Sequence, residues 1–190
     1  MGIPVPQVLV SEVDYLETER DASTRHEYVD GVLFAMTGAS RAHNQIATNL
    51  TIALGTHLRG SGCRVASSDM KVRLGDTNRR YYYPDAVVSC SDPDEEPDAY
   101  TETRPVLVVE ILSRSTAAID RREKRLAYQA MPSVIDYLIV SQESREVERF
   151  TRAGESWTHT LFGTGETVEL VSIGFALAME ELYADIALDD

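Results

Sequence analysis

Residues 105–112 have the sequence PVLVVEIL, a nearly continuous apolar run that one carboxylate, Glu110, interrupts. Such a run is typical of a strand covered on both faces, so we expect the central strand of a sheet here. The segment from Thr116 to Met131 has the pattern of an amphipathic helix, which Pro132 closes, and residues 136–141, DYLIVS, predict a second buried strand. A strand–helix–strand crossover of this kind predicts that the two strands lie parallel.

The chain before residue 36 predicts a short helix followed by a hairpin. Ser11 and Asp14 form a capping-box-like start to a helix over SEVDYLET, in which Val13 and Leu16 are the expected apolar contacts. The runs RHEYV and VLFAM then flank Asp30-Gly31. Asp-Gly between alternating apolar runs is a strong hairpin signal, so we expect two antiparallel strands.

A long helix and a second hairpin are expected next. The helix runs from about Ala39 to Leu58, ends at the glycines of RGSG, and has its apolar positions at Ile46, Leu50, Ile52, Ala53 and Leu54. The hairpin joins CRVASSDMKVRL to RRYYYPDAVVSC through the turn GDTN. Pro84 lies inside its second half and predicts an edge position or a bulge, because proline cannot donate a ladder hydrogen bond.

The remaining segments complete a mixed α/β (α+β) architecture. A hairpin of EVERFTR and SWTHTLF around Ala153-Gly154, a strand near residues 167–172 and a short helix over MEELYADIAL follow the crossover. The order of elements predicts a central mixed sheet flanked by helices, with additional hairpins.

Length and charge restrict the classes of protein to consider. The 190 residues predict a single domain over 1–190. No segment approaches the roughly 18 apolar residues that span a bilayer, and the start lacks the basic region of an export signal, so we expect a cytoplasmic protein without membrane contact. Cys63 and Cys90 are too few for a disulfide framework and are expected to be free thiols. Because 18 basic and 31 acidic residues give a net charge of −13, nonspecific binding to nucleic acid is disfavoured.

Two carboxylates stand in apolar surroundings. Asp85 follows Pro84 in YYYPDAVV, and Glu110 lies within VLVVEIL. A buried carboxylate must be paired, hydrogen-bonded or metal-bound. Each could be a structural hydrogen-bonding partner, but two on strands that we expect to pair also suit a shared Mg²⁺ or Mn²⁺ ion, because these ions prefer oxygen ligands.

The helix after Glu110 carries a polar row. Asp120, Lys124 and Tyr128 recur four residues apart and therefore lie on one helix face, whereas Glu123 and Arg125 are expected to point elsewhere. The row could be an ion pair on a solvated surface. If instead the helix packs back on the sheet, Lys124 could reach the carboxylate pair, orient a water and stabilise negative charge on a phosphate.

Three further residues are candidates with open alternatives. Asp69 either joins the carboxylates or bonds backbone amides where a strand starts. Glu27 either completes the site or lies on the open face of a hairpin, and His43 either meets phosphate or is a surface residue at a helix end. The sequence has no Gly-rich phosphate loop, GxSxG, HExxH or CxxC pattern, which argues against nucleoside-triphosphate hydrolases, serine hydrolases and zinc proteases.

Several of these segments together resemble a known family. The chain from about residue 11 to residue 182 is similar to the Uma-type family of proposed restriction endonucleases, within the PD-(D/E)xK nuclease superfamily. The resemblance rests on RHEYVDGVLFAMTGAS with its following His, SSDMKVRL, YYYPDAVV, VLVVEILSRSTAAIDRREKRLAYQ and the DYLIV strand. One position departs from the superfamily pattern, because Leu112 stands where the lysine of ExK is expected.

The resemblance implies both a fold and a site. It implies a restriction-endonuclease-like mixed sheet, often seen as a homodimer, over about residues 11–182, with residues 1–10 and 185–190 outside it and expected to be flexible. It implies that Asp85 and Glu110 are metal ligands and that Lys124 is a catalytic lysine that has migrated to the next helix. The supporting polar residues would be Glu27, Asp69, Tyr128, Asp120 and His43.

The leading functional hypothesis is a Mg²⁺-dependent nuclease acting on DNA, with Mn²⁺ as a possible substitute. The net charge and the broken ExK pattern favour an alternative, a noncatalytic binding or regulatory module that retains the fold. A third possibility is an enzyme that uses the same metal site on a small phosphorylated compound. The hairpin of Trp157 is a candidate dimer surface.

Overall fold

The structure is a computed structural model, and it describes residues 9–36, 38–75, 79–92, 94, 96, 98–112 and 120–188, without the side chains of residues 120 and 121. The expected ends 1–8 and 189–190, most of the GDTN turn and the start of the helix expected at Thr116 lie outside the described residues. Within the described part, no helix is long and apolar enough to cross a membrane.

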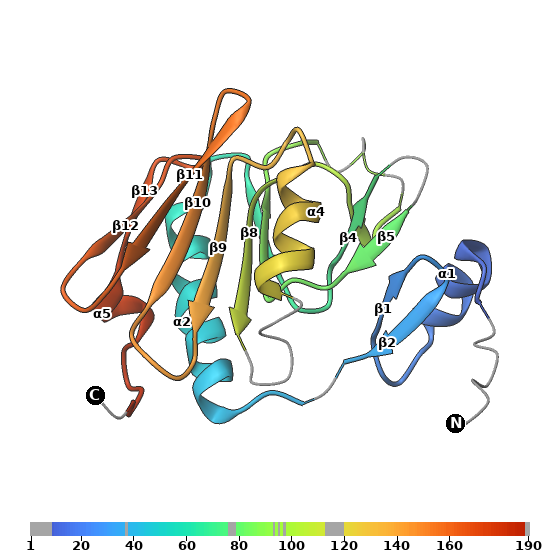
Figure 1. Cartoon of the computed structure of the whole chain (residues 1–190), viewed down its shortest axis with the longest axis horizontal. Helices are drawn as coiled ribbons and strands as arrows, with labels where there is room; N and C mark the ends of the chain where they lie inside the picture. The colour runs from blue at the N-terminus through green and yellow to red at the C-terminus, as the bar shows by residue number, and fades with distance from the viewer. Residues whose placement is uncertain are drawn as a thin grey trace, which may run out of the picture.

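A six-stranded mixed sheet forms the centre of the fold (Figure 1). Its order is β11-β10-β9-β8-β6-β3. The expected central strand is β8 (Pro105–Leu112), and it runs parallel to β9 (Asp136–Ser141), as the crossover predicts. The other pairs are antiparallel and involve β3 (Arg64–Ser67), β6 (Ala86–Ser89), β10 (Val147–Ala153) and β11 (Ser156–Phe162). The expected hairpin around Ala153-Gly154 is therefore confirmed.

Helices cover both faces of this sheet. Because side chains alternate along a strand, Leu107, Val109 and Ile111 pack on the side of α2 (Arg41–His57), and Val108 and Leu112 pack on the side of α4 (Arg125–Gln129). The long helix is confirmed, except that Ile52 is 61% exposed instead of buried. A π-helical turn, η2 (Asp120–Lys124), leads into α4.

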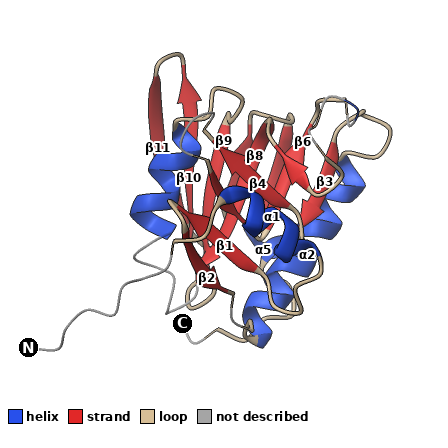
Figure 2. Cartoon of the chain, turned by 90° about the vertical axis from the view of Figure 1, so that its right-hand side faces the viewer, coloured by secondary structure: helices blue, strands red, loops and turns tan. Residues whose placement is uncertain are grey.

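A second, five-stranded sheet lies beside the first (Figure 2). Its strands, in the order β2-β1-β5-β4-β7, are β1 (His26–Val29), β2 (Val32–Ala35), β4 (Lys71–Leu74), β5 (Arg80–Tyr82) and β7 (Thr101–Glu102). The expected first hairpin is β1–β2. Asp30 (φ 51°) and Gly31 (φ 90°) both have the positive φ angles that the two-residue turn requires.

The N-terminal helix, α1 (Glu12–Arg20), begins as predicted. The Ser11 hydroxyl accepts a hydrogen bond from the backbone N–H of Asp14 and so caps the helix. The expected contacts are only partly right, because Val13 is 64% exposed and the helix instead buries Tyr15 against tyrosines of the five-stranded sheet. The burial of the large Tyr15 ring, two positions after Val13, explains this rotation of the apolar face.

The second hairpin was expected as one ribbon and is instead divided between the two sheets. β4 and β5 pair in the five-stranded sheet, and β3 and β6 pair in the six-stranded sheet. The chain changes sheet at Ser68–Met70 on one side and at Tyr83–Asp85 on the other. Pro84 therefore lies in the break between strands, where its missing N–H costs no ladder bond.

The C-terminal segment adds a two-stranded sheet. The expected strand is β12 (Thr167–Leu170), but its partner β13 (Phe175–Ala178) was not predicted, and the helix expected next is reduced to α5 (Met179–Leu182). Buried Asp136 ties this segment to the main sheet by accepting hydrogen bonds from the Thr151 hydroxyl and the Ser172 N–H.

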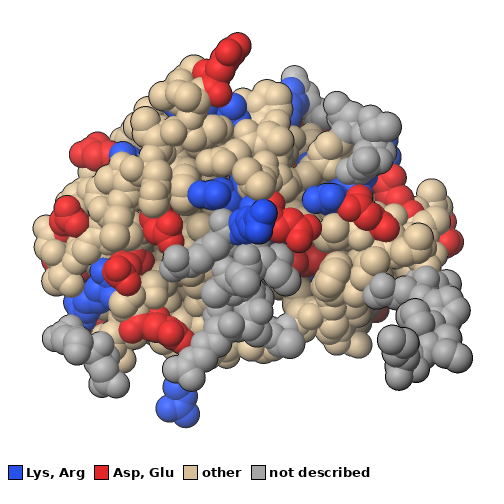
Figure 3. All heavy atoms as spheres, viewed as in Figure 1, with Lys and Arg blue, Asp and Glu red and all other residues tan. Residues whose placement is uncertain are grey.

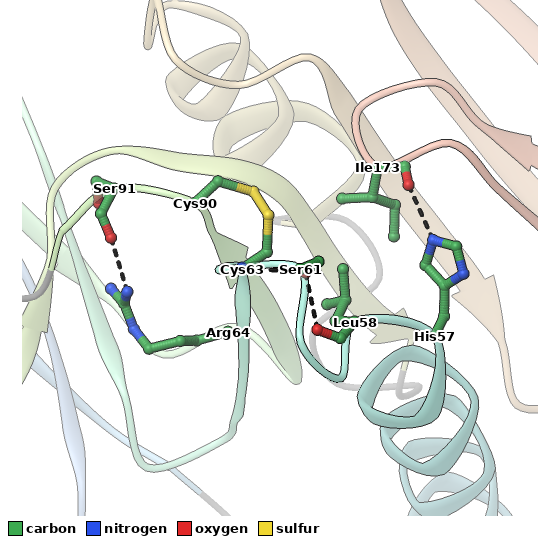
Figure 4. Close-up of a disulfide and its surroundings, with 8 residues drawn as sticks. All are labelled: His57, Leu58, Ser61, Cys63, Arg64, Cys90, Ser91 and Ile173. Carbon is green, nitrogen blue, oxygen red and sulfur yellow. Dashed lines mark hydrogen bonds between the residues drawn. A yellow bond between two sulfur atoms is a disulfide. The ribbon is translucent and has the colours of Figure 1, made fainter.

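The expectation of free thiols is wrong, because Cys63 and Cys90 form a disulfide (Figure 4). β3 and β6 are antiparallel with Arg64 opposite Ser89, so the next residues outward, Cys63 and Cys90, also face each other, with Cα atoms 4.0 Å apart. The number of cysteines could not reveal this strand pairing.

Candidate metal-dependent catalytic site

The two carboxylates singled out in the sequence meet where β6 begins beside β8. Glu110 is buried and, by strand alternation, points to the α4 side of the sheet. Asp85 Oδ2 accepts a hydrogen bond from the backbone N–H of Ile111 at 2.6 Å, which places this carboxylate next to the Glu110 residue on the neighbouring strand.

Lys124 reaches Glu110 from the helical segment. Its Nζ lies 2.8 Å from Glu27 Oε1 and 3.3 Å from Glu110 Oε2, and the side chain is buried. The alternative of an ion pair on a solvated surface is therefore excluded. The Lys124 ammonium also lies 5.4 Å from the centre of the Tyr82 ring, whose π face favours a cation.

Tyr128 contacts the same carboxylate from one turn further along the helix. Its hydroxyl donates a hydrogen bond to Glu110 Oε1 at 3.2 Å. Burial, together with the negative charge of Glu110, raises the pKa of the Tyr128 phenol well above its usual value. The phenol therefore keeps its proton and remains a donor to Glu110.

Glu27 connects the two sheets at the site. It lies on β1 of the five-stranded sheet, and its carboxylate contacts both Lys124 and the backbone N–H of Tyr83, at 3.3 Å. The alternative that Glu27 lies on the open face of a hairpin is therefore wrong.

His43 also lies at the site, in the first turn of α2. Ser40 caps this helix by accepting a hydrogen bond from the His43 N–H, and His43 Nε2 lies 3.1 Å from Asp85 Oδ1. Among the described residues, His43 Nδ1 is buried and has no hydrogen-bond partner. In a neutral imidazole one ring nitrogen carries the proton and the other is an acceptor. The contact with Asp85 favours the proton on Nε2, so Nδ1 is then an acceptor.

The other candidates lie differently. Asp69 is 84% exposed and pairs with Arg25 at 3.5 Å, although it lines the same cleft as the carboxylate pair. The side chain of Asp120 lies outside the described residues. Glu123 was expected to point elsewhere, but it lines the same cleft and accepts a hydrogen bond from the Tyr82 hydroxyl at 3.2 Å. The expected four-residue spacing assumed an α-helix, and the π-helical turn η2 changes which side chains share a face.

These residues line one open cleft of about 1350 Å³, between α2, the β1–β2 hairpin and the ends of β6 and β8. The acidic residues among its described lining are Glu27, Asp69, Asp85, Glu110, Glu123 and Glu143, and the basic ones are Arg25 and Lys124. On the face drawn in Figure 3, the blue basic and red acidic side chains of the described residues are interspersed.

The chemistry of the donors fits a magnesium ion. Asp85 and Glu110 supply carboxylate oxygens. Within the described part of the chain each Asp85 oxygen has one protein partner, which leaves it a lone pair. No group of three or more His, Cys, Asp or Glu side chains within the described ranges has the geometry of a preformed metal site. Magnesium commonly binds through one or two carboxylates and keeps several waters, so two carboxylates are enough.

Comparisons with known proteins show the family and the fold of the chain. The Uma2 family, described as "Putative restriction endonuclease", matches residues 12–180. Two uncharacterized proteins of Synechocystis sp. are similar: slr1290 is 35% identical over 97% of this chain and 95% of its own, and sll1609 is 28% identical over 85% and 92%. A crystal structure from Anabaena variabilis, described as a "putative nuclease" of DUF820, superposes with a TM-score of 0.74 and 14% identity, covering 90% of this chain and 96% of the other, so the nuclease-like fold is shared. The chain belongs to the Uma2 family of restriction-endonuclease-like proteins.

Proposed function

We propose that the protein is a magnesium-dependent nuclease that hydrolyses phosphodiester bonds of DNA, with manganese as a substitute ion. One observation carries the proposal: buried Lys124 contacts Glu110, and Glu110 shares the cleft with Asp85. Membership of the family and the nuclease-like fold support this class of reaction.

Asp85 and Glu110 would hold the ion. When bound, magnesium polarises a phosphate oxygen and lowers the pKa of a water. Lys124 would donate hydrogen bonds to the phosphate oxygens as negative charge develops, and Glu27 and Tyr128 would keep Lys124 and Glu110 in place. A lysine suits this role, because its ammonium is a compact charge on a flexible side chain. It can therefore reach the site from a helix and need not lie on the strand itself.

His43 would act through Asp85. A histidine that donates to one carboxylate oxygen, while the Ile111 N–H binds the other, restricts the rotation of the Asp85 carboxylate. Such outer contacts orient metal ligands, and their removal weakens metal affinity about 10- to 100-fold in characterised sites. We therefore expect His43→Ala to weaken Mn²⁺ binding, and His43→Gln, which retains an N–H donor, to restore part of it.

The test is cleavage of plasmid and single-stranded circular DNA in Mg²⁺ or Mn²⁺. The wild type is compared with Asp85→Asn, Glu110→Gln and Lys124→Met, and Glu155→Gln, an exposed carboxylate in the β10–β11 turn, is the matched control. We expect cleavage by the wild type and the control only, and calorimetric Mn²⁺ binding that is lost in Asp85→Asn. If the wild type binds Mn²⁺ but cuts neither DNA, the nuclease proposal fails and the noncatalytic module takes its place.

A further inference from the structure

The cleft has an exposed aromatic side chain directly beside the proposed catalytic residues. Phe34, on β2, is 47% exposed and lines the cleft. In the β1–β2 ladder it stands directly opposite Glu27, the residue that contacts Lys124. Directly opposed residues project from the same face of a sheet with Cβ atoms about 4.5–5.5 Å apart, so the Phe34 ring adjoins the Glu27–Lys124 pair.

The part of the cleft that α2 lines is also partly apolar. Ile52 on α2 lines the cleft and is 61% exposed. A helix that packs on a sheet normally turns such an apolar residue toward the sheet. Around Ile52 the lining is neutral and polar, with Asn44, Thr48 and Thr51 on the same helix. An aromatic ring from β2 and an aliphatic side chain with neutral polar groups from α2 suit a flat, partly apolar ligand.

The charges of the cleft oppose a double helix. Duplex DNA is held mainly by Lys and Arg side chains that neutralise phosphates. Among the described lining residues only Arg25 and Lys124 are basic, and each is already paired, with Asp69 and Glu27 respectively. A single strand also exposes its bases, and stacking of an unpaired base on an aromatic side chain supplies affinity that does not depend on neutralising phosphates.

The size of the cleft favours a polymer over a small metabolite. Sites for small molecules have volumes of about 300–1,000 Å³, and this cleft, at about 1350 Å³, is larger and open to solvent. The third hypothesis from the sequence, a small phosphorylated compound, leaves the exposed Phe34 and Ile52 without a function.

We infer that the cleft binds single-stranded nucleic acid, with an unpaired base stacked on Phe34 next to the phosphate that is cut. This inference rests on the proposed function and adds its substrate class. The proposed catalytic groups would act on the phosphate while the ring holds the adjoining base, so duplex DNA would be a poor substrate unless it is locally unpaired.

Binding is measured first, without metal, by fluorescence anisotropy of a labelled single-stranded oligonucleotide and of its duplex. The variants are Phe34→Ala, Phe34→Tyr, which retains the ring, and Leu33→Ala as the matched control. Leu33 is the neighbouring exposed residue of β2, stands opposite Tyr28 and lies outside the cleft lining. All four proteins are also compared by thermal unfolding and sedimentation.

We expect the single strand to bind at least tenfold tighter than the duplex. Phe34→Ala should weaken binding of the single strand about 5- to 150-fold, the range given by loss of one stacked base, while Phe34→Tyr and Leu33→Ala stay within about threefold of the wild type. An oligonucleotide with abasic sites should bind the wild type and Phe34→Ala equally, because the base that stacks is missing.

Cleavage in Mn²⁺ separates the two ways of failing. If duplex and single strand are cut equally and Phe34→Ala cuts like the wild type, the inference is overturned and the nuclease proposal stands. If neither is bound or cut, the proposed function fails and the inference fails with it. A Phe34→Ala variant that changes the sedimentation of the protein and not its affinity for DNA would assign the ring to an interface and also overturn the inference.

Discussion

Replacing Lys124 by methionine should lower the free energy of unfolding by about 3–5 kcal/mol, which is the usual cost of removing one partner of a buried ion pair. Lys124, Glu110 and Glu27 are all largely removed from solvent, and the two carboxylates lie 3.3 and 2.8 Å from the same ammonium. Methionine keeps the length and apolar character of the stem, so the loss measures mainly the charge. For a chain of this size the change corresponds to a melting temperature lower by about 6–20 °C.

The assay is urea unfolding followed by circular dichroism, in EDTA. Arg122→Met is the matched control, because Arg122 is an exposed cation of the same helical turn and should change stability by less than about 0.5 kcal/mol. Adding Glu27→Gln to Lys124→Met should recover stability, with a coupling of about 0.5–3 kcal/mol, because it removes one of two unneutralised carboxylates. A Lys124→Met variant that is as stable as Arg122→Met would refute the buried contact and, with it, the argument that Lys124 reaches Glu110.

Three further predictions concern other parts of the molecule. Tyr128→Phe removes the hydroxyl that donates to Glu110 and should cost about 1 kcal/mol in urea unfolding, together with weaker Mn²⁺ binding in calorimetry; unchanged Mn²⁺ affinity would contradict a positioning role for the hydroxyl. Reduction of the Cys63–Cys90 disulfide opens a loop across 27 positions and should lower stability by about 3–4 kcal/mol, measured by thermal unfolding with and without reductant, and a double serine variant should be insensitive to the reductant. Burial lowers the pKa of the Lys71 ammonium below 10.5. Just below this pH the unfolded chain therefore binds more protons than the folded chain, and the free energy of unfolding should rise with pH. Lys71→Met should flatten this rise.

The sequence predicts well what depends on local pattern. The run of PVLVVEIL before a helix and DYLIVS is enough to predict parallel β8 and β9, and Asp30-Gly31 is enough to predict the β1–β2 hairpin. Glu110 stands out because a carboxylate inside such a run requires a partner. These predictions use neighbours within a few residues or within one strand–helix–strand unit.

Contacts between distant segments could not be predicted in the same way. The Cys63–Cys90 disulfide depends on the pairing of β3 with β6, and the contact of Glu27 with Lys124 depends on how the two sheets approach each other. The contact of His43 with Asp85 likewise requires α2 to cross the end of the strands. Hydrophobic periodicity determines which face of an element is buried, but it does not determine which other element covers that face.

The geometry of β8 explains why the lysine of this site comes from a helix. Residues 110 and 112 point to the same side of the strand, so a lysine at position 112 would stand beside Glu110. Here that position is Leu112, which is buried in the apolar cluster that includes Tyr128 and Tyr137, so an ammonium there would lose its hydration. Lys124 approaches the same face of β8 from the helical segment that covers it, and contacts both Glu110 and Glu27. Leu112 thus extends the apolar core beneath the helix. Lys124 on the helical segment supplies the positive charge next to Glu110. The break in the ExK pattern is therefore compatible with an active site. Leu112→Lys combined with Lys124→Leu tests this explanation. We expect an unstable protein, since the exchange buries a charge in the apolar cluster, and a variant as stable as the wild type would refute the explanation.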